Sequence, residues 1–447
     1  MTDRRELIDQ ALRGVEAWEA RWGAMPGADA LTTDVDLAAL LDAYAARMDA
    51  TLPFFHPRYA GQMLKAPHPV AVAAYLAAMI VNPNNHAIDA SQATSPMEVE
   101  VMRSLGAMFG LPDGALGHLT SSGTIANLEA LWVARELAPG TAVVHSEAAH
   151  YTHGRMCQVL GVESRAVRAL PDGRMDPDAV AAEVARGGVG TVVLTPGTTG
   201  VGAVDDIRAA LELKERHGVR LHVDGAYGGF FALLGEHDAY AAIGGCDSVV
   251  VDPHKHGLQP YGCGAVLFAD PGVGRLYQHD SPYTYFTSDE LHLGEISLEC
   301  SRAGAAAGAL WLTLQAFPLE RDRGLGAILG ACRRGALDLA GRLRASERLR
   351  LHLDPALDIV VYWPRRTRMS EIDAASAAML HAGTADRDDP VFLSTLRVDA
   401  DAFAALHPDV ERDADAVRVL RSVLMKPEHE AWVGPLHARL EALADAV

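Results

Sequence analysis

Short apolar runs alternate with stretches of helical periodicity between residues 118 and 268, and this alternation strongly restricts the possible folds. The runs lack the polar alternation of a half-exposed strand, so each strand is expected to be buried on both faces. They lie at 141–146, 190–197, 219–225, 248–252 and 264–268. The pattern predicts an α/β fold in which helices cover both faces of a mostly parallel sheet.

Polar residues directly follow four of these runs. In the order of the runs, they are residues 145–153, Thr198 with Thr199, Asp224, and His254 with Lys255. In open parallel sheets, ligands bind beyond the carboxyl ends of the strands. The sequence therefore predicts a binding site at that edge of the sheet.

A second, smaller unit is expected after the large sheet. Residues 301–345 have helical periodicity, and β-like runs alternate with helices again from residue 349 onward. A chain of 447 residues is also too long for one minimal core. We therefore predict an N-terminal helical segment (1–55), a large domain (56–320) and a small C-terminal α+β domain (321–447).

The composition argues against several kinds of partner. The net charge of −19 would repel a nucleic-acid backbone, and no apolar run is long enough to span a bilayer. The first residues form a charged amphipathic pattern rather than a secretory signal. The five cysteines include no CxxC pair, which argues against a disulfide framework and a cysteine zinc site. We expect a cytoplasmic protein that binds neither nucleic acid nor membranes.

Lysine is rare in this chain, and one of its few lysines lies at a predicted strand end. The lysines are Lys65, Lys214, Lys255 and Lys426, whereas arginine supplies the other 35 of the 39 basic residues. An arginine can neither form an imine nor release its proton near neutral pH, so Lys255 suggests chemistry that needs a primary amine. The alternative is that this position arose by chance.

Two further features could hold opposite ends of a small molecule. The hydroxyl-rich turn at 120–124 opens into a helix, whose free N–H groups and positive end would bind an anion such as phosphate. Asp224 ends a strand and could meet a protonated ring nitrogen. Each feature also has an ordinary interpretation, since Ser122 or Asp224 could simply cap a helix.

The segment 145–153 is rich in histidine and allows two interpretations. On a helix, His150 and His153 lie one turn apart and could bind a metal together with Glu147. In the other interpretation, one histidine lies flat against a ring. The segment has neither HExxH nor a clear carboxylate–histidine triad, which argues against a metal site.

An anion site, a partner for a pyridine nitrogen and an imine-forming lysine together specify pyridoxal 5′-phosphate (PLP), because each binds a different end of that molecule. The segment "DSVVVDPHKHGLQPYGCG" (247–264) resembles the lysine signature of group II PLP-dependent decarboxylases, the family of aromatic amino acid, glutamate and tyrosine decarboxylases. Other blocks are similar to that family's in the same order, namely "TSSGTIAN", "SEAAHYTHGRMCQVLG", "TPGTTGVGAVDDI", "HVDGAYGG" and "SLECSRAGAAAGALW". The resemblance covers about residues 55–315 and, more faintly, 419–429. It implies a fold-type I enzyme that decarboxylates an L-amino acid and forms a homodimer with a shared active site.

The resemblance also implies roles for individual residues. It assigns the Schiff base to Lys255, the pyridine nitrogen to Asp224 and the stacked ring to His150. It further places Ser122, Gly123 and Thr124 at the phosphate, Thr198 or Thr199 near the ring hydroxyl, Ala226 against the other face of the ring, and His254 near the phosphate or imine. The sequence departs from the family pattern at Ser122, Ile125 and Gly225, where glycine, glutamate and alanine are usual.

Fold-type I enzymes use one scaffold for several reactions, so aminotransfer, retro-aldol cleavage and β-elimination are alternatives. An arginine clamp on the α-carboxylate favours proton removal, whereas an apolar pocket labilises the carboxylate. Arg421, a candidate substrate-binding residue, falls roughly where other fold-type I enzymes carry that clamp. The family's decarboxylases protonate Cα with a mobile-loop tyrosine, for which Tyr285 is a candidate with Tyr283.

The segment "PFFHPRYAG" (53–61) bears on the substrate side chain. Phe54, Phe55 and Tyr59 favour an aromatic substrate, with Phe55 as the candidate contact. Arg58 and Lys65 favour an acidic one instead. We predict an aromatic L-amino acid. A regulator that only senses the cofactor is the non-enzymatic alternative, and it would leave the catalytic set without a use.

Overall fold

The computed structural model describes residues 3–23, 33–278 and 297–447. Its largest element is a seven-stranded sheet with the order β1-β7-β6-β5-β4-β2-β3. The strands are β1 (Leu116–Thr120), β2 (Ala142–Ser146), β3 (Ser164–Val167), β4 (Val189–Leu194), β5 (Arg220–Asp224), β6 (Ser248–Val251) and β7 (Gly264–Phe268). Strand β7 is antiparallel to β1 and β6, and the other neighbours are parallel, which confirms the predicted mostly parallel sheet.

Two of these strands were not predicted, because polar residues hide them in the sequence. Strand β3 is an edge strand with two exposed positions. Strand β1 contains His118, whose ring is fully buried and lies 2.8 Å from Oε2 of Glu129. A buried histidine inside a strand interrupts the apolar run on which recognition of the strand depends.

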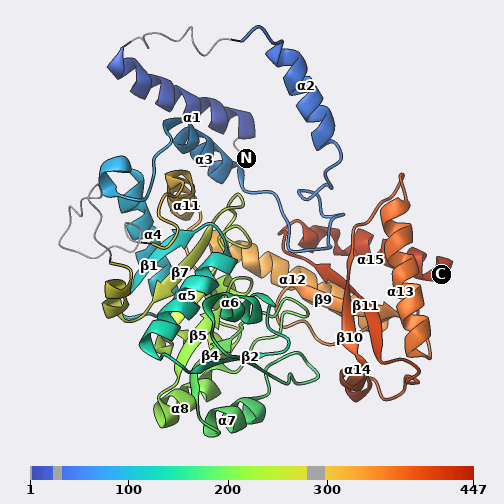
Figure 1. Cartoon of the computed structure of the whole chain (residues 1–447). Helices are drawn as coiled ribbons and strands as arrows, with labels where there is room; N and C mark the ends of the chain where they lie inside the picture. The colour runs from blue at the N-terminus through green and yellow to red at the C-terminus, as the bar shows by residue number, and fades with distance from the viewer. Residues whose placement is uncertain (1–2, 24–32, 279–296) are drawn as a thin grey trace.

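Helices cover both faces of the large sheet (Figure 1). They are α4 (Thr94–Phe109), α5 (Gly123–Leu137), α6 (Thr152–Leu160), α7 (Pro177–Ala185), α8 (Ile207–His217), α9 (Asp238–Ala241) and α11 (Gly304–Ala316). Successive residues of β4 show the two faces, because Val192 and Leu194 share a core with α4, α7 and α8. Val193 between them packs with residues of α5 and α6. The strands are therefore buried on both sides, as their apolar runs predict.

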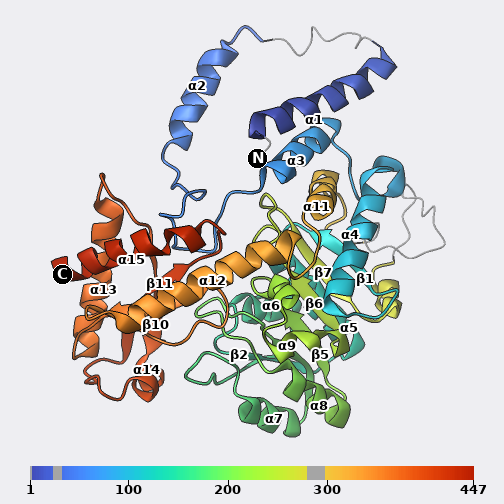
Figure 2. The same ribbon diagram turned by 180° about the vertical axis from the view of Figure 1, so that it is seen from behind.

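A smaller antiparallel sheet, with the order β10-β11-β9-β8, follows toward the C-terminus. Its strands are β8 (Leu349–Leu351), β9 (Ile359–Pro364), β10 (Ser394–Asp399) and β11 (Ala416–Val423), and its helices are α13 (Met369–Ala385), α14 (Ala400–Leu406) and α15 (His429–Ala446). The long helix α12 (Gly324–Ala345) runs from the large sheet to this unit (Figure 2). Together the two sheets confirm the predicted fold class.

The chain just after residue 55 packs on the small unit rather than on the large one. The backbone N–H of Ala60 donates to the carbonyl of Phe392 at 2.9 Å, and that of Val423 donates to the carbonyl of Ala60 at 2.9 Å. Nζ of Lys426 donates to the carbonyl of Tyr59 at 2.6 Å. The first residues of the predicted large domain thus contact the small unit, and the domain boundaries stay a prediction.

The N-terminal helices differ in how they are packed. Helix α1 (Arg4–Glu19) lies on α3 (Pro69–Val81), whereas every residue of α2 (Leu37–Met48) is exposed. Figure 1 shows α2 projecting beyond the rest of the chain. Within the described ranges, no helix combines the length and the apolar character needed to cross a membrane. The cytoplasmic location stays a prediction.

A buried ion pair fixes the strand that leads into the hydroxyl-rich turn. Nη1 of Arg302 donates to Oε1 of Glu98 at 2.8 Å and to the carbonyl of Leu119 at 2.7 Å. The N–H of Leu119 in turn donates to Oε1 of Glu98 at 2.8 Å. This network joins the segment after the lysine block to β1, and so holds the turn that begins one residue later.

Candidate active site

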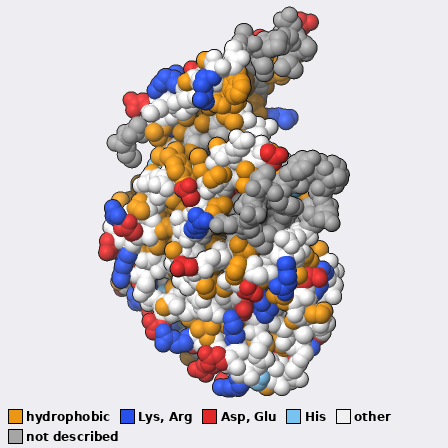
Figure 3. Space-filling view, turned by 90° about the vertical axis from the view of Figure 1, so that its left-hand side faces the viewer, with side chains coloured by type: hydrophobic (Ala, Val, Ile, Leu, Met, Phe, Trp, Pro, Cys, Tyr) orange, Lys and Arg blue, Asp and Glu red, His pale blue; other side chains and the backbone are white. Residues whose placement is uncertain are grey.

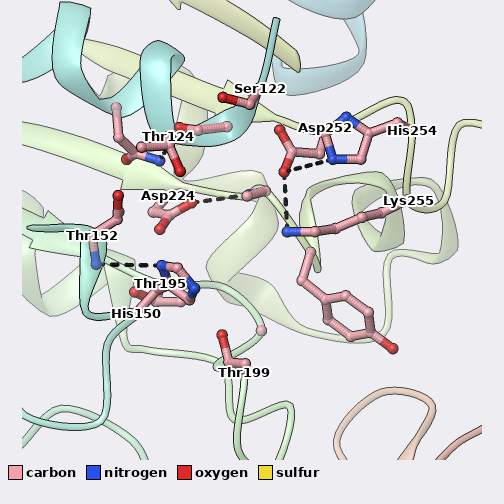
Figure 4. A pocket seen from close by; sticks show the side chains of 15 residues that line it. Ser122, Thr124, His150, Thr152, Thr195, Thr199, Asp224, Asp252, His254 and Lys255 are labelled. Atoms are coloured by element: carbon pink, nitrogen blue, oxygen red, sulfur yellow. Dashed lines mark hydrogen bonds and ion pairs between the residues drawn. The ribbon is translucent and has the colours of Figure 1, made fainter. Parts of the chain in front are cut away.

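A pocket of about 200 Å³ lies at the carboxyl edge of the large sheet, where the sequence predicts a site. The turns after β2, β4, β5 and β6 and the start of α5 form its wall (Figure 4). Of the predicted cofactor residues, the pocket is lined by Ser122, Gly123, Thr124, His150, Asp224, Ala226, His254 and Lys255. The structure thus brings together residues that span more than 130 positions of the sequence, because parallel strands end at one edge.

The first turn of α5 forms the side of the pocket suited to an anion. Oγ of Ser122 accepts the N–H of Ile125 at 3.3 Å, so Ser122 caps the helix and also lines the pocket. A Cβ at Gly123 would lie 2.5 Å from a carboxylate oxygen of Asp252, so only glycine fits there. The N–H groups of the first turn and the helix dipole favour negative charge at this end.

Lys255 reaches into the pocket beside an acidic residue. Its Nζ lies 3.0 Å from Oδ2 of Asp252, and Nε2 of His254 lies 3.5 Å from the same oxygen (Figure 4). Asp252 was not predicted, although it stands only three residues before the lysine. Its carboxylate holds the ammonium group at the wall, so the amine must leave Asp252 before it can react.

Asp224 ends β5 with both carboxylate oxygens hydrogen-bonded. Oδ1 accepts the N–H of Ala226 at 3.1 Å, and Oδ2 lies 2.9 Å from Nε2 of His153. Burial alone would raise the pKa of Asp224, but the hydrogen bond from His153 and the nearby Lys255 outweigh it and hold that pKa well below its usual value. The side chain is thus an anion in the pocket wall.

The two histidines of the proposed metal pair point to different partners. His150 lines the pocket, and its Nδ1 accepts the N–H of Thr152 at 3.3 Å. Burial lowers the pKa of His150, which favours a neutral ring. His153 instead contacts Asp224, and Oε1 of Glu147 accepts the N–H of Ala169 at 2.9 Å. In the described part of the chain, no group of three or more histidine, cysteine or acidic side chains could hold a metal.

The turn after β4 corrects one predicted residue. Oγ1 of Thr198 accepts the N–H of Ala203 at 3.0 Å and lies outside the pocket lining, whereas Thr199 lines the pocket. Glycine is required beneath this turn, since Gly197 has φ +121° and a Cβ there would lie 2.8 Å from Cα of Gly228. The close approach of these two backbones shapes the floor of the site.

The predicted substrate-binding residues do not line the pocket within one chain. Arg421 is buried behind it, where Nη2 donates to the carbonyl of Thr199 at 2.7 Å and Nε to that of Gly200 at 2.9 Å. Arg421 therefore holds the turn from behind instead of presenting a free clamp. Phe55 is 67% exposed, because its segment packs on the small unit with the Phe55 ring outward. Tyr283 and Tyr285 lie outside the described residues.

One long-range contact at the site has no signal in the sequence. Tyr227 lines the pocket, and its hydroxyl donates to Oδ1 of Asp358 at 2.5 Å across 131 residues. Burial raises the pKa of Asp358 to about 6. Asp358 directly precedes β9, so the small unit contacts the pocket wall through this pair.

Several buried polar atoms of the lining have no protein partner in the described residues. They are Oγ1 of Thr152, Oγ1 of Thr195, Oδ1 of Asp252 and Nδ1 of His254. Buried polar groups without partners are costly and rare, so their gathering in one pocket indicates a polar ligand. PLP fits this set, since Lys255 would hold its aldehyde, Asp224 would meet its ring nitrogen and the first turn of α5 would bind its phosphate.

Comparison with known sequences also points to a PLP-dependent protein. A model of the pyridoxal-dependent decarboxylase conserved domain matches residues 34–365. An L-tyrosine decarboxylase of Enterococcus faecium is 28% identical over 422 residues, covering 71% of this chain and 68% of the relative. A probable L-aspartate decarboxylase of Halobacterium salinarum is 33% identical over 278 residues, covering 61% of this chain and 77% of the relative.

Solved structures show the same fold. The crystal structure of mouse CSAD has a TM-score of 0.80 at 21% identity, covering 97% of this chain and 92% of that one. The structure of Oryza sativa TDC with PLP and tryptamine has a TM-score of 0.79 at 17% identity, covering 98% and 97%. With the family match over 34–365, the chain belongs to the pyridoxal-dependent decarboxylase family and is a PLP-dependent amino acid decarboxylase.

Proposed function

We propose that the protein removes the α-carboxyl group of an aromatic L-amino acid, with Lys255, Asp224 and His150 at the centre of the site. The observation that carries this proposal is the lining of the pocket. Lys255, Asp224 and His150 converge there from three separate strand ends, and Lys255 is the one lysine or arginine of the described lining.

Bound PLP supplies an electron sink for the charge left at Cα when carbon dioxide departs. Lys255 would provide the primary amine that holds the cofactor's aldehyde. Asp224 would keep a proton on the ring nitrogen, and the neutral ring of His150 would lie against the cofactor ring. The backbone N–H groups of Gly123 and Thr124 would donate to the phosphate, and Thr199 would take the place of Thr198 near the ring hydroxyl.

The charge of the lining supports an aromatic side chain over an acidic one. A second carboxylate on the substrate would need its own cation, because burying an unpaired charge is costly. Arg421 already donates to two carbonyl groups, and Arg58 is paired with Asp389. Tyr151 and Tyr261 flank the lining, with rings 4.3 Å from His150 and 4.8 Å from His254, and both are more than half exposed.

A homodimer is also part of the proposal, and α2 supports it. The exposed large apolar residues of this helix share one stripe, at Leu37, Leu40, Leu41, Tyr44 and Met48. Hydrophobic side chains also gather on the upper half of the face drawn in Figure 3. An amphipathic helix whose apolar side meets only water is unfavourable, so a second copy is its expected cover. Sedimentation velocity of the purified protein tests this, and a monomer at micromolar concentration would contradict it.

The substrate test uses the PLP-loaded enzyme with L-tyrosine, L-phenylalanine, L-tryptophan, L-aspartate and L-glutamate, each supplied alone. Carbon dioxide, amine and keto acid are followed together by mass spectrometry. We expect amine and carbon dioxide, and a kcat/KM for the best aromatic substrate about 10²-fold above that for either acidic one. An acidic amino acid as the best substrate would contradict the assigned side chain. Keto acid without carbon dioxide would contradict decarboxylation.

A further inference from the structure

His153 lies directly beneath the pocket and has no role in the scheme above. It stands in the first turn of α6 and its side chain is fully buried. Its Nε2 lies 2.9 Å from Oδ2 of Asp224, the carboxylate assigned to the ring nitrogen. This contact leaves His153 outside the reach of substrate but in direct contact with a residue that meets the cofactor.

The surroundings of His153 determine which of its nitrogens carries the proton. Asp224 is ionised, so its oxygen accepts and Nε2 must donate. Nδ1 of His153 has no hydrogen-bond partner within residues 3–23, 33–278 and 297–447, and a proton there would be buried without an acceptor. The geometry therefore favours the tautomer with the proton on Nε2.

Two other histidine rings lie near His153, but each has its own partners. His145, with its centroid 5.9 Å away, contacts the carbonyl of Ser146 and the hydroxyl of Ser164. His222, at 6.4 Å, contacts Oδ1 of Asn127 and Oγ of Ser248. Neither ring competes for Asp224, so the contact between His153 and Asp224 is specific.

We propose that His153 is a positioning residue that donates from Nε2 to Asp224, keeps this carboxylate ionised and so keeps the proton on the cofactor's ring nitrogen. The inference rests on the proposed function through the role given there to Asp224. It adds a role for His153, to which the family resemblance gave none.

The physical argument concerns the proton that the cofactor's ring nitrogen and the carboxylate of Asp224 would share. Burial favours the neutral carboxyl form of Asp224, and the donor from His153 opposes it. Without that donor, the remaining hydrogen bond to Asp224 comes from the N–H of Ala226 to Oδ1. The proton then moves from the ring nitrogen to Oδ2, one N–H bond breaks and one O–H bond forms, and both charges disappear. No further reactant is needed.

Variants of His153 separate this role from simple packing. His153→Leu keeps an apolar volume of similar size but removes the donor. His153→Gln keeps an N–H donor near the position of Nε2. His145→Leu is the matched control, because it removes a neighbouring, half-buried ring that does not touch Asp224.

The experiment loads each protein with PLP carrying ¹⁵N in the ring and records its ¹⁵N NMR signal at neutral pH. We expect a protonated ring nitrogen in the wild type, in His153→Gln and in His145→Leu. In His153→Leu we expect the loss of that signal in favour of the unprotonated position. A folded, PLP-bound His153→Leu protein with the wild-type signal would overturn the proposal.

A second measurement reads the tautomer of His153 in the wild-type protein and uses a variant only to assign its signals. Long-range ¹H–¹⁵N correlations of the histidine-labelled wild-type holoenzyme report the tautomer of each ring, and the His153 signals are assigned by their absence in His153→Gln. We expect the proton on Nε2. A proton on Nδ1 alone would mean that Asp224 donates to His153, and this would also overturn the proposal.

One further variant distinguishes failure of this inference from failure of the proposed function. In Asp224→Asn, the ring ¹⁵N signal should move to the unprotonated position if Asp224 meets that nitrogen. A response to Asp224→Asn without a response to His153→Leu overturns the role of His153 alone. No response to either overturns the placement of Asp224, and with it the proposed site.

Discussion

Replacing Lys255 with alanine abolishes covalent attachment of the cofactor and lowers the decarboxylation kcat by at least about 10³-fold. The variant would lose both the amine that anchors the cofactor and the proton transfers that such a group makes. Proton transfer by a positioned group alone contributes about 10²–10⁴-fold to the rate. Nζ of Lys255 is the amine that lines the described pocket, 3.0 Å from Asp252. No nearby side chain can take over this amine chemistry, since an arginine cannot.

The measurement is intact-protein mass spectrometry after borohydride reduction, together with turnover on the best substrate. Wild-type protein should gain the mass of one reduced cofactor, and Lys255→Ala should gain none. Lys214→Ala is the control, because Lys214 lies on the surface of α8, bonded to the carbonyl of Gly245 and paired with Asp247. Attachment that persists in Lys255→Ala would show that another lysine holds the cofactor.

Replacing Asp224 with alanine is expected to lower kcat by about 10²–10³-fold while weakening PLP binding much less. The carboxylate of Asp224 would stabilise the positive charge that must stay on the ring nitrogen during the reaction. Removal of one preorganised electrostatic group typically has an effect of this size. The first turn of α5, which is proposed to bind the phosphate, is untouched by the change and should retain most of the binding. Near-wild-type turnover in this variant would contradict the assignment.

Steady-state kinetics and a PLP titration of the same Asp224→Ala sample separate the two effects. The pKa of Asp224 is held below its usual value in the folded protein, so its ionised form stabilises the fold at any pH above the usual aspartate range. That stabilisation is lost only as the pH falls through the lowered value. The wild-type carboxylate is thus charged throughout the neutral range, and loss of its charge near pH 7 cannot explain a change in rate there.

The sequence was informative where strand ends determine position. Lys255, Asp224 and His150 each follow a recognisable apolar run, and parallel strands bring such positions to one edge. The choice between Thr198 and Thr199 was beyond this reasoning, because it depends on which side chain of a tight turn faces outward. Here the N–H of Ala203 donates to the hydroxyl of Thr198, whereas Thr199 lines the pocket.

Residues far away in the sequence were harder to place for a different reason. Arg421 lies in β11 of the small sheet, and only the folded chain shows that its guanidinium meets the carbonyls of Thr199 and Gly200. The partner of Tyr227 is 131 residues away, with no motif that links the two. Phe55 was assigned on its aromatic character alone, which does not report the direction of the ring.

The contacts of Arg421 and Asp358 with the pocket wall restrict how the C-terminal unit can be removed or exchanged. A polypeptide that stopped near residue 320 would lack the guanidinium beneath Thr199 and Gly200 and the acceptor of the Tyr227 hydroxyl. Two carbonyl groups and one hydroxyl would then be left without these partners at the floor of the site. The C-terminal unit is therefore not an exchangeable module. A recombined enzyme that took it from a distant relative would have to inherit these two side chains with it, or repair the floor by other means.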